Sequence, residues 1–348
     1  MATGFGIIGC GMIANFHAKA LADTPDAELV ACCDRSPERA KAFGEEHSIP
    51  YYESVEAMVA DPKVDAVTIG TPSGAHLEPA LAAAAAGKHV VVEKPLEVTL
   101  DRCDQIIQAC DAAGVKLSVT FQSRFHKSSQ LIKQAVDDKR FGTVTMGDAY
   151  VKWYRTQEYY DSGAWRGTWK LDGGGALMNQ AIHTVDLLTW MMGPVTEITA
   201  AVGTLAHERI EVEDVAVATV KFENGALGVI EASTAAYPGS LKRIEISGSH
   251  GTAILEEEDI KMWEFAEMTD EDHRIQSEMI GKNETGGGAA DPAAIGHHGH
   301  TEVFTDFVRA IGSDGTPLVD GHEGRRSVEI ILAIYKAAQS NGPVQLPL

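Results

Sequence analysis

Short apolar runs alternate with segments of helical composition through the first third of the chain, and this alternation constrains the fold most. Most of their residues are apolar, so they predict strands that are buried on both faces. Ser36 before Pro37, and Thr99 further on, predict the starts of two of the intervening helices. Unbroken apolar strands separated by helices indicate a parallel sheet covered on both faces. The predicted strands span residues 5–9, 28–33, 66–70, 88–92 and 115–120.

A glycine-rich turn joins the first predicted strand to the helix that follows it. Gly9, Gly11 and Ala14 form the pattern G-x-G-x-x-A, which permits a tight turn, close approach of a pyrophosphate and close packing of the helix. Asp34 ends the second strand, where a carboxylate accepts the ribose hydroxyls of NAD and repels the 2′-phosphate of NADP. Arg35 beside it weakens this preference, since a guanidinium could receive that phosphate. The alternative is a plain glycine turn, with Asp34 capping the next helix.

The pattern changes after Gln122. Strand-like segments now follow one another directly, and Asn224-Gly225 and His250-Gly251 have the residue types of hairpin turns, which predicts an antiparallel sheet. Further helices are expected at residues 176–192, 301–311 and 323–339, and a long loop at 281–299. A chain of 348 residues exceeds one typical domain, so we expect two, at residues 1–122 and 123–348.

Composition narrows the choice of partner and compartment. Fifty acidic residues against 29 basic ones give a net charge of −21, which argues against nucleic acid or an anionic membrane. No apolar run approaches a membrane span, and the N-terminus lacks the basic start of a signal peptide. Five cysteines without a CxxC pair fit a reducing cytoplasm. Cys103 and Cys110, if on one helix, lie about 10 Å apart along its axis, beyond disulfide reach.

Two patches carry side chains suited to chemistry. Glu93-Lys94 comes directly after a buried strand, at the edge where α/β sheets bind ligands, although an ordinary solvated loop is the alternative. Asn179, His183 and Asp186 are spaced to share one face of a helix, which suits a histidine that accepts a proton. A histidine buried in the core is the alternative there. A metal site would need more carboxylate or histidine ligands at this spacing.

His297, His298 and His300 form a dense cluster after the long loop. No carboxylate or cysteine stands at a matching short spacing, so we expect no bound metal. We expect instead that the loop brings His300, at a helix start, towards the substrate.

These motifs together resemble the Gfo/Idh/MocA oxidoreductase family over essentially the whole chain. The resemblance implies an N-terminal Rossmann domain with a parallel sheet and a C-terminal α+β domain with a large open, mostly antiparallel sheet. It also implies a homodimer or homotetramer formed through that sheet. The motifs are G-x-G-x-x-A, Thr71-Pro72 followed by His76, Glu93-Lys94-Pro95, Trp165-Arg166-Gly167 and the segment GGGALMNQAIHTVDLLTWMMG.

The resemblance also implies roles for individual residues. Lys94 is similar to the catalytic lysine of the family, and His183 to the general base of a motif that usually reads Asp-x-x-x-His. Asn179 replaces that aspartate here, and an amide can hydrogen-bond substrate but cannot take a proton. The implied cofactor-binding residues are Gly9, Gly11, Met12, Ile13, Asp34, Arg35, Thr71, Pro72, His76, Glu93, Lys94, Gln122, Trp165 and Arg166. The implied substrate-binding residues are Lys94, Arg124, Asn179, His183 and His300.

The sequence therefore predicts a cytoplasmic NAD-dependent dehydrogenase acting on a secondary alcohol of a sugar, nucleotide sugar or cyclitol. In this prediction His183 accepts the hydroxyl proton and Lys94 stabilises the developing alkoxide. One alternative is an NAD-dependent glycosidase that acts by transient oxidation and elimination. The other is a dinucleotide-sensing regulator without activity, which the presence of both Lys94 and His183 disfavours.

Overall fold

A computed structural model describes residues 2–281 and 296–348, and the chain divides into two compact units. The first unit holds Met1–Gln122, Lys170–Gly173 and Gly296–Val328. The second holds Ser123–Trp169, Gly174–Ile295 and Glu329–Leu348. The return of residues 296–328 to the first unit differs from the expected division at residue 122. The expected loop at residues 281–299 lies mostly outside the described residues.

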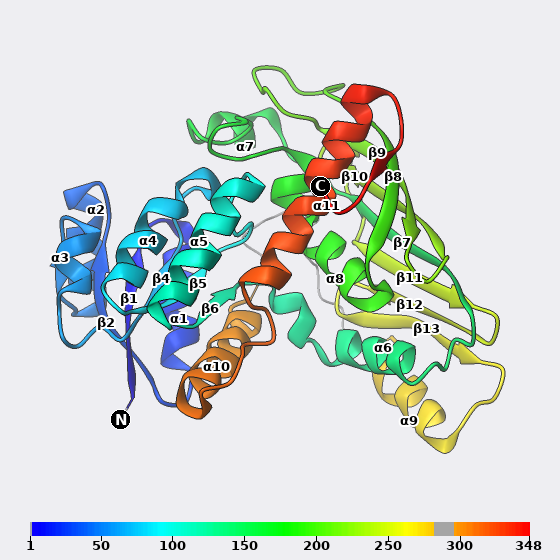
Figure 1. Ribbon diagram of the computed structural model, residues 1–348, viewed down its shortest axis with the longest axis horizontal. Coiled ribbons are helices and arrows are strands. Elements are labelled where there is room, and N and C mark those ends of the chain that lie inside the picture. The colour runs from blue at the N-terminus through cyan, green and yellow to red at the C-terminus, as the bar shows by residue number, and fades with distance from the viewer. Residues whose placement is uncertain (1, 282–295) are drawn as a thin grey trace. The chain divides into compact units, whose positions relative to one another are not determined.

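The first unit is built on a six-stranded sheet in which every pair of neighbouring strands is parallel. Its order is β3-β2-β1-β4-β5-β6, which confirms the predicted parallel sheet and adds the two-residue strand β3. Figure 1 labels the other five strands. The strands are β1 (Thr3–Ile8), β2 (Ala27–Cys33), β3 (Tyr51–Tyr52), β4 (Ala66–Ile69), β5 (His89–Val92) and β6 (Leu117–Val119). The helices are α1 (Met12–Ala22), α2 (Pro37–His47), α3 (Val55–Val59), η1 (Ser73–Ala75), α4 (Leu77–Ala85), α5 (Leu100–Ala113) and α10 (His298–Ser313).

Both predicted caps begin helices of this unit. The Ser36 hydroxyl accepts a hydrogen bond from the Arg39 N–H, with Pro37 in the first turn. The Thr99 hydroxyl accepts one from the Arg102 N–H. These caps satisfy N–H groups that a helix start otherwise leaves without a partner.

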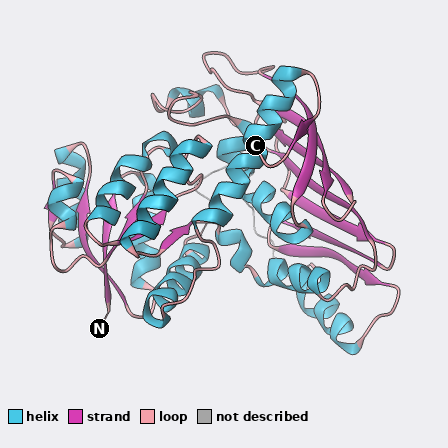
Figure 2. Ribbon diagram, viewed as in Figure 1, coloured by secondary structure: helices cyan, strands magenta, loops and turns pink. Residues whose placement is uncertain are grey.

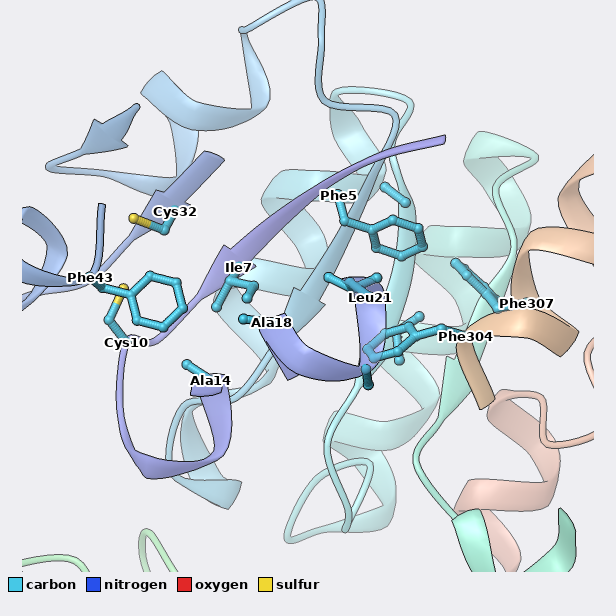
Figure 3. Close-up of a cluster of buried hydrophobic side chains, with 13 residues drawn as sticks. Phe5, Ile7, Cys10, Ala14, Ala18, Leu21, Cys32, Phe43, Phe304 and Phe307 are labelled. Atoms are coloured by element: carbon cyan, nitrogen blue, oxygen red, sulfur yellow. The ribbon is translucent and has the colours of Figure 1, made fainter. Parts of the chain in front are cut away.

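Aromatic side chains attach α10 to the first unit. Phe304 and Phe307 of α10 pack on Phe5 of β1, with ring centroids 5.5 and 6.3 Å apart. Figure 3 shows them beside Leu21 and Ala18 of α1, within one buried cluster. Burial of these rings is the physical reason that a segment so late in the sequence folds with the first unit.

The second unit is built on an eight-stranded sheet of order β13-β12-β11-β7-β10-β9-β8-β14. Its pairs are antiparallel except β10 with β7, which confirms the predicted, mostly antiparallel sheet. Both predicted hairpin turns occur, one joining β9 to β10 and the other β11 to β12. The strands are β7 (Val144–Lys152), β8 (Val195–Gly203), β9 (Val215–Phe222), β10 (Leu227–Ser233), β11 (Arg243–Gly248), β12 (Gly251–Glu256), β13 (Asp259–Phe265) and β14 (Val344–Gln345).

Helices cover one face of this sheet, as Figure 2 shows, with α8 against β7 and β11 and α6 against β12. The other face exposes Met146, Val217 and Leu227. The helical elements of this region are η2 (Gln122–Phe125), α6 (Lys127–Asp137), α7 (Gln157–Asp161), η3 (Ala176–Ala181), α8 (Ile182–Met192) and α9 (Asp270–Met279). Helix α11 (Gly321–Ser340) begins in the first unit and continues into the second. The helix predicted at residues 176–192 begins as a π-helix, η3, before it continues as α8.

All five cysteines are free and buried, and Cys103 and Cys110 share α5 as expected. None of the helices in residues 2–281 and 296–348 has both the length and the apolar character to cross a membrane.

Candidate active site

The glycine turn of the first unit leaves room for a ligand at the start of α1. Gly9 has a φ of +94°, and a Cβ there would lie 3.0 Å from the backbone of Gly70. A Cβ on Gly11 would meet no atom within 4 Å, so this residue faces open space. In the described structure no side chain caps α1, and its first turn carries no acidic residue. Free N–H groups at an uncapped helix start, beside an open glycine, fit a pyrophosphate.

Asp34 is held next to this turn by several donors. The Cys10 and Ser36 N–H groups donate to its carboxylate at 2.9 and 2.7 Å, and the Arg39 guanidinium donates at 2.8 Å. Burial opposes ionisation of Asp34, but these hydrogen bonds outweigh burial and lower its pKa. An ionised Asp34 fits the ribose hydroxyls of NAD. Arg35, in which we expected a competing charge, is exposed, whereas Arg39 is the arginine that pairs with Asp34.

Glu93 follows β5, and two histidines hydrogen-bond to its carboxylate. The His17 Nε2–H donates to Glu93 Oε1 at 2.9 Å, and the His300 Nε2–H donates to the same oxygen at 3.2 Å. Burial lowers the pKa of His17, while the two imidazoles hold the pKa of Glu93 well below its usual range against the effect of burial. His300, expected near the substrate, therefore lies buried on Glu93 within the first unit.

Lys94, the residue after Glu93, is half-buried. Its N–H donates to Glu93 Oε2 at 3.1 Å and to the Thr120 hydroxyl at 3.2 Å. The backbone of Lys94 is thus fixed by two side chains, one of which is itself held by His17 and His300. The other histidines of the late cluster lie apart from Glu93: His297 is 2.8 Å from Asp23, and the rings of His297 and His298 are in contact.

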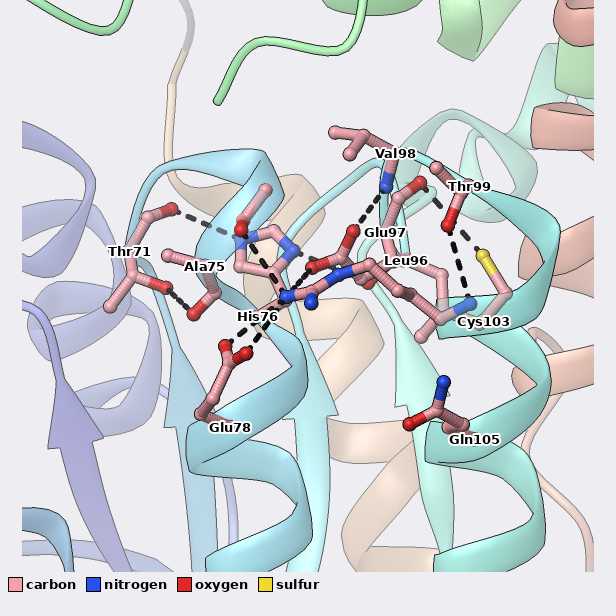
Figure 4. A network of polar contacts seen from close by, with 12 residues as sticks. Thr71, Ala75, His76, Glu78, Leu96, Glu97, Val98, Thr99, Cys103 and Gln105 are labelled. Carbon is pink, nitrogen blue, oxygen red and sulfur yellow. Dashed lines mark hydrogen bonds and ion pairs between the residues drawn. The ribbon is translucent and has the colours of Figure 1, made fainter. Parts of the chain in front are cut away.

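His76 hydrogen-bonds to two loops at the carboxyl edge of the same sheet, one carrying Thr71 and the other Pro95. Its Nδ1 lies 2.9 Å from the Pro95 oxygen and its Nε2 lies 3.0 Å from the Thr71 oxygen (Figure 4). Burial lowers the pKa of His76, so the neutral ring donates to one of these oxygens at a time. Glu97 is fully buried beside it and pairs with Arg102 at 2.9 Å. This network fixes the shape of the loop that carries Thr71 and Pro72.

In the second unit, η3 and α8 present two polar side chains on an otherwise buried segment. Between Gly174 and Thr189 every residue is buried except Asn179 and His183. Asp186, expected on the same face, is fully buried instead. Asn179 and His183 are therefore the two residues of this segment that are partly exposed.

A buried arginine explains the position of Asp186. Arg124 donates to the Asp186 carboxylate through Nε at 2.8 Å and through Nη2 at 2.7 Å, and both side chains are about 1% exposed. The guanidinium also lies over the ring of Trp190. This bidentate pair joins η2 to α8, and it uses the guanidinium of Arg124, which we expected to bind substrate.

Arginine and aromatic side chains surround the amide next to Asn179. Gln180 accepts from Arg155 Nη2 at 2.9 Å and donates to the Tyr159 hydroxyl and to Asn179 Oδ1, at 2.9 and 2.8 Å. Arg166 stacks over the rings of Tyr159 and Trp165. The Trp165-Arg166 motif therefore belongs to a cluster of cations and aromatic rings that orients Asn179.

Glu213 is the residue of this region that sequence reasoning missed. It precedes β9, and its carboxylate accepts from the Gly175 N–H at 3.0 Å, the Leu177 N–H at 2.8 Å and the Tyr335 hydroxyl at 3.0 Å. Burial raises its pKa to about 7 against these hydrogen bonds. No local pattern links a glutamate before a strand to a glycine turn almost 40 residues earlier. Arg39 and His17 were also missed, although each is a polar residue in the first turns of a predicted helix.

The described geometry defines a class of protein: an oxidoreductase with a dinucleotide-binding unit and a second unit that presents a half-buried histidine. Two family models match the chain. One, described as "Oxidoreductase family, NAD-binding Rossmann fold", matches residues 3–121, and the other, "GFO/IDH/MocA C-terminal domain", matches residues 129–254. The chain belongs to the Gfo/Idh/MocA family, and it is an NAD-binding oxidoreductase that acts on CH–OH groups.

Individual relatives agree with this assignment. The WlbA dehydrogenase from Bordetella pertussis, in complex with NADH and UDP-GlcNAcA, is 37% identical with a TM-score of 0.90, covering 100% of this chain and 98% of its own. WlbA from Chromobacterium violaceum, with the same ligands, is 36% identical with a TM-score of 0.88, covering 100% and 96%. Inositol 2-dehydrogenase from Rhizobium meliloti (strain 1021) is 30% identical, covering 74% of this chain and 76% of its own.

Proposed function

We propose that the protein is an NAD-dependent dehydrogenase of a secondary hydroxyl on a sugar ring, with Lys94 and His183 handling the proton. The observation that carries this proposal is the exposure pattern of η3 and α8. Asn179 and His183 alone remain half-buried between Gly174 and Thr189. An imidazole beside an amide, on a segment otherwise buried, supplies a proton acceptor and a group that orients substrate.

The residues of the first unit fit the cofactor. The uncapped start of α1 would hold the pyrophosphate at Gly11, and the ionised Asp34 would accept the ribose hydroxyls. NAD supplies the hydride acceptor when it is bound. We further propose a preference for NAD over NADP, since a 2′-phosphate would face the carboxylate of Asp34.

Each chemical group has a separate task in the proposed reaction. His183 accepts the proton of the substrate hydroxyl, and Asn179 hydrogen-bonds a neighbouring hydroxyl. The Lys94 ammonium donates to the reacting oxygen and stabilises its developing negative charge. The hydrogen bonds from His17 and His300 to Glu93 support this role. They hold the carboxylate that accepts from the Lys94 N–H, and so they fix the backbone of Lys94.

We propose a nucleotide sugar that carries a carboxylate as the substrate. The two WlbA dehydrogenases are 37% and 36% identical to this chain, whereas the inositol dehydrogenases from Rhizobium meliloti and Thermotoga maritima are 30% and 28% identical. The arginines near Asn179 also support an anionic substrate. Arg166 makes no ion pair among the described residues and is held only against aromatic rings, so its charge remains available to an anion.

The test is NADH formation, followed by absorbance, with three substrates. We expect UDP-GlcNAcA to have the highest kcat/KM, and UDP-N-acetylglucosamine, which has a hydroxymethyl group in place of the carboxylate, to be at least tenfold poorer. A higher kcat/KM for myo-inositol would replace the nucleotide sugar by a cyclitol. Release of an aglycone without net NADH formation would indicate the glycosidase reaction instead.

We also propose that the protein is a homodimer or homotetramer that associates through the uncovered face of the eight-stranded sheet. That face exposes Met146, Val217 and Leu227 on neighbouring strands, which favours contact with a second copy. Light scattering after size-exclusion chromatography measures the mass. The variant Leu227→Asp is expected to shift the mass towards the monomer value of 37.2 kDa.

A further inference from the structure

Glu213 joins three parts of the second unit at the point where the helix of Asn179 and His183 begins. Its carboxylate binds the N–H groups of Gly175 and Leu177 and the hydroxyl of Tyr335 on α11. Its backbone oxygen accepts from the Ala176 N–H at 3.1 Å. Glu213 therefore caps η3 from a distant part of the sequence, a task that a neighbouring serine or aspartate performs in most helices.

The turn before η3 is packed too closely to shift on its own. A Cβ on Gly175 would lie 1.9 Å from the Glu213 backbone oxygen, and a Cβ on Gly174 would lie 2.1 Å from the Tyr335 hydroxyl. We propose that Glu213 is a positioning residue for the reaction, whose carboxyl group fixes the turn that sets the places of Asn179 and His183. The inference rests on the proposed function, since it assumes that these two side chains contact substrate.

The surroundings of Glu213 contain few charges. The six residues of η3 include no ionisable side chain, and β9 and β10 turn apolar residues towards η3. On α11 the ionisable neighbour is Tyr335. The next residue, Asp214, is engaged separately, by three N–H groups and the ring of His207. Burial without a compensating cation raises the pKa of Glu213 to about 7, although its hydrogen-bond donors lower it.

The direction of the pH effect follows from linkage. A carboxyl group with a higher pKa in the closed turn than in water binds its proton more tightly when the turn is closed. Ionisation of Glu213 therefore favours opening of the turn, and the positions of Asn179 and His183 become less well defined above pH 7. Alcohol oxidation should rise with pH as histidine loses its proton and then fall as Glu213 ionises, which gives a bell-shaped profile.

Two variants separate this role from a merely structural one. We expect kcat/KM of the native protein to fall by up to about tenfold per pH unit above the optimum, and Glu213→Gln to lose this falling limb. Tyr335→Phe removes a donor to the ionised carboxylate, so its falling limb should move to higher pH. Glu211→Gln, which changes an exposed carboxylate two residues away, should keep the native profile. Parallel profiles for native protein and Glu213→Gln would overturn the proposal.

Hydrogen exchange of the amides of residues 175–183 tests the same role without substrate. After correction for the intrinsic pH dependence of exchange, we expect protection in the native protein to fall as pH rises through about 7. Protection in Glu213→Gln should not change over this range. If no substrate is oxidised, the proposed function fails, whereas a pH-independent protection in the native protein refutes the role of Glu213.

Discussion

Asp34 in the first unit and Glu213 in the second both bind backbone N–H groups through their carboxyl groups, but their pKa values are shifted in opposite directions. Each accepts two backbone N–H groups, from Cys10 and Ser36 in one case and from Gly175 and Leu177 in the other. The pKa of Asp34 is lowered despite its burial, whereas burial raises the pKa of Glu213 to about 7.

The two carboxylates differ in a neighbouring cation and in the depth of burial, since Asp34 is 9% exposed and Glu213 is 3% exposed. Arg39 donates to Asp34 at 2.8 Å, while the third donor to Glu213 is the neutral hydroxyl of Tyr335. At Glu213, therefore, two backbone N–H groups and a hydroxyl do not offset the effect of burial on the pKa, whereas at Asp34 the N–H groups together with a guanidinium do. The first unit thus presents a fixed negative charge, and the second contains a group that titrates in the neutral range.

His183→Asn is expected to have the largest effect, because it removes the proposed base from the second unit. Loss of a general base lowers kcat by roughly 10²- to 10⁴-fold. The rising limb of the pH profile for oxidation should disappear, and only the falling limb assigned to Glu213 should remain. Initial rates of NADH formation between pH 5.5 and 9 measure this. An unchanged rising limb would assign the base to another residue.

Lys94→Ala tests the first unit in the same way. Loss of a donor to the developing oxyanion lowers kcat by roughly 10²- to 10³-fold. The affinity for NADH, measured by fluorescence titration, should change less than about threefold, since the proposed pyrophosphate contacts lie at Gly11. Lys94→Arg is the matched control, which keeps the charge. Unaltered turnover of Lys94→Ala would remove this residue from the proposed chemistry.

Stability should depend on pH in opposite directions for the two carboxylates. The pKa of Glu213 is raised from 4.5 to about 7, so its contribution is complete below pH 4.5 and is lost as pH rises through 7. The shift corresponds to about 3 kcal/mol. The contribution of Asp34, whose pKa is lowered, is lost only as pH falls below its ordinary range.

Chemical denaturation at pH 5.5 and 8.5 measures this difference. The free energy of unfolding should decrease with pH more steeply in the native protein than in Glu213→Gln. The same comparison with Glu211→Gln should show the native slope. A slope that Glu213→Gln leaves unchanged would contradict the raised pKa.

Arg39→Ala should have the smallest effect. It would leave Asp34, like Glu213, without a cation to lower its pKa. The pKa of Asp34 should rise when its partner is removed, since the guanidinium is the cation that lowers it. The preference for NAD over NADP, measured as a ratio of dissociation constants, should change by about tenfold or less, because Arg39 is largely exposed. Arg35→Ala is the control. A larger change in Arg35→Ala would identify Arg35 as the residue that meets the 2′-phosphate.

Local sequence patterns were sufficient to predict most of the strands and helices of the first unit. All its strands except β3 could be predicted because they lie in mostly apolar runs, and two of its helices because Ser36 and Thr99 cap them through residues three positions away. The place of α10 could not be predicted in this way. Its attachment depends on contact of Phe304 and Phe307 with Phe5, about 300 residues earlier in the chain.

The sequence by itself determined the two kinds of sheet, the dinucleotide turn and the helix that carries Asn179 and His183. These features depend on residues close together in the chain, whose spacing fixes periodicity, turns and caps. Only the tertiary structure decided which charged groups of the candidate site are paired. His17 and His300 hydrogen-bond to Glu93, Arg124 pairs with Asp186, and Glu213 caps η3. Burial and distant donors set the charge of such groups, and neither is defined until the chain has folded.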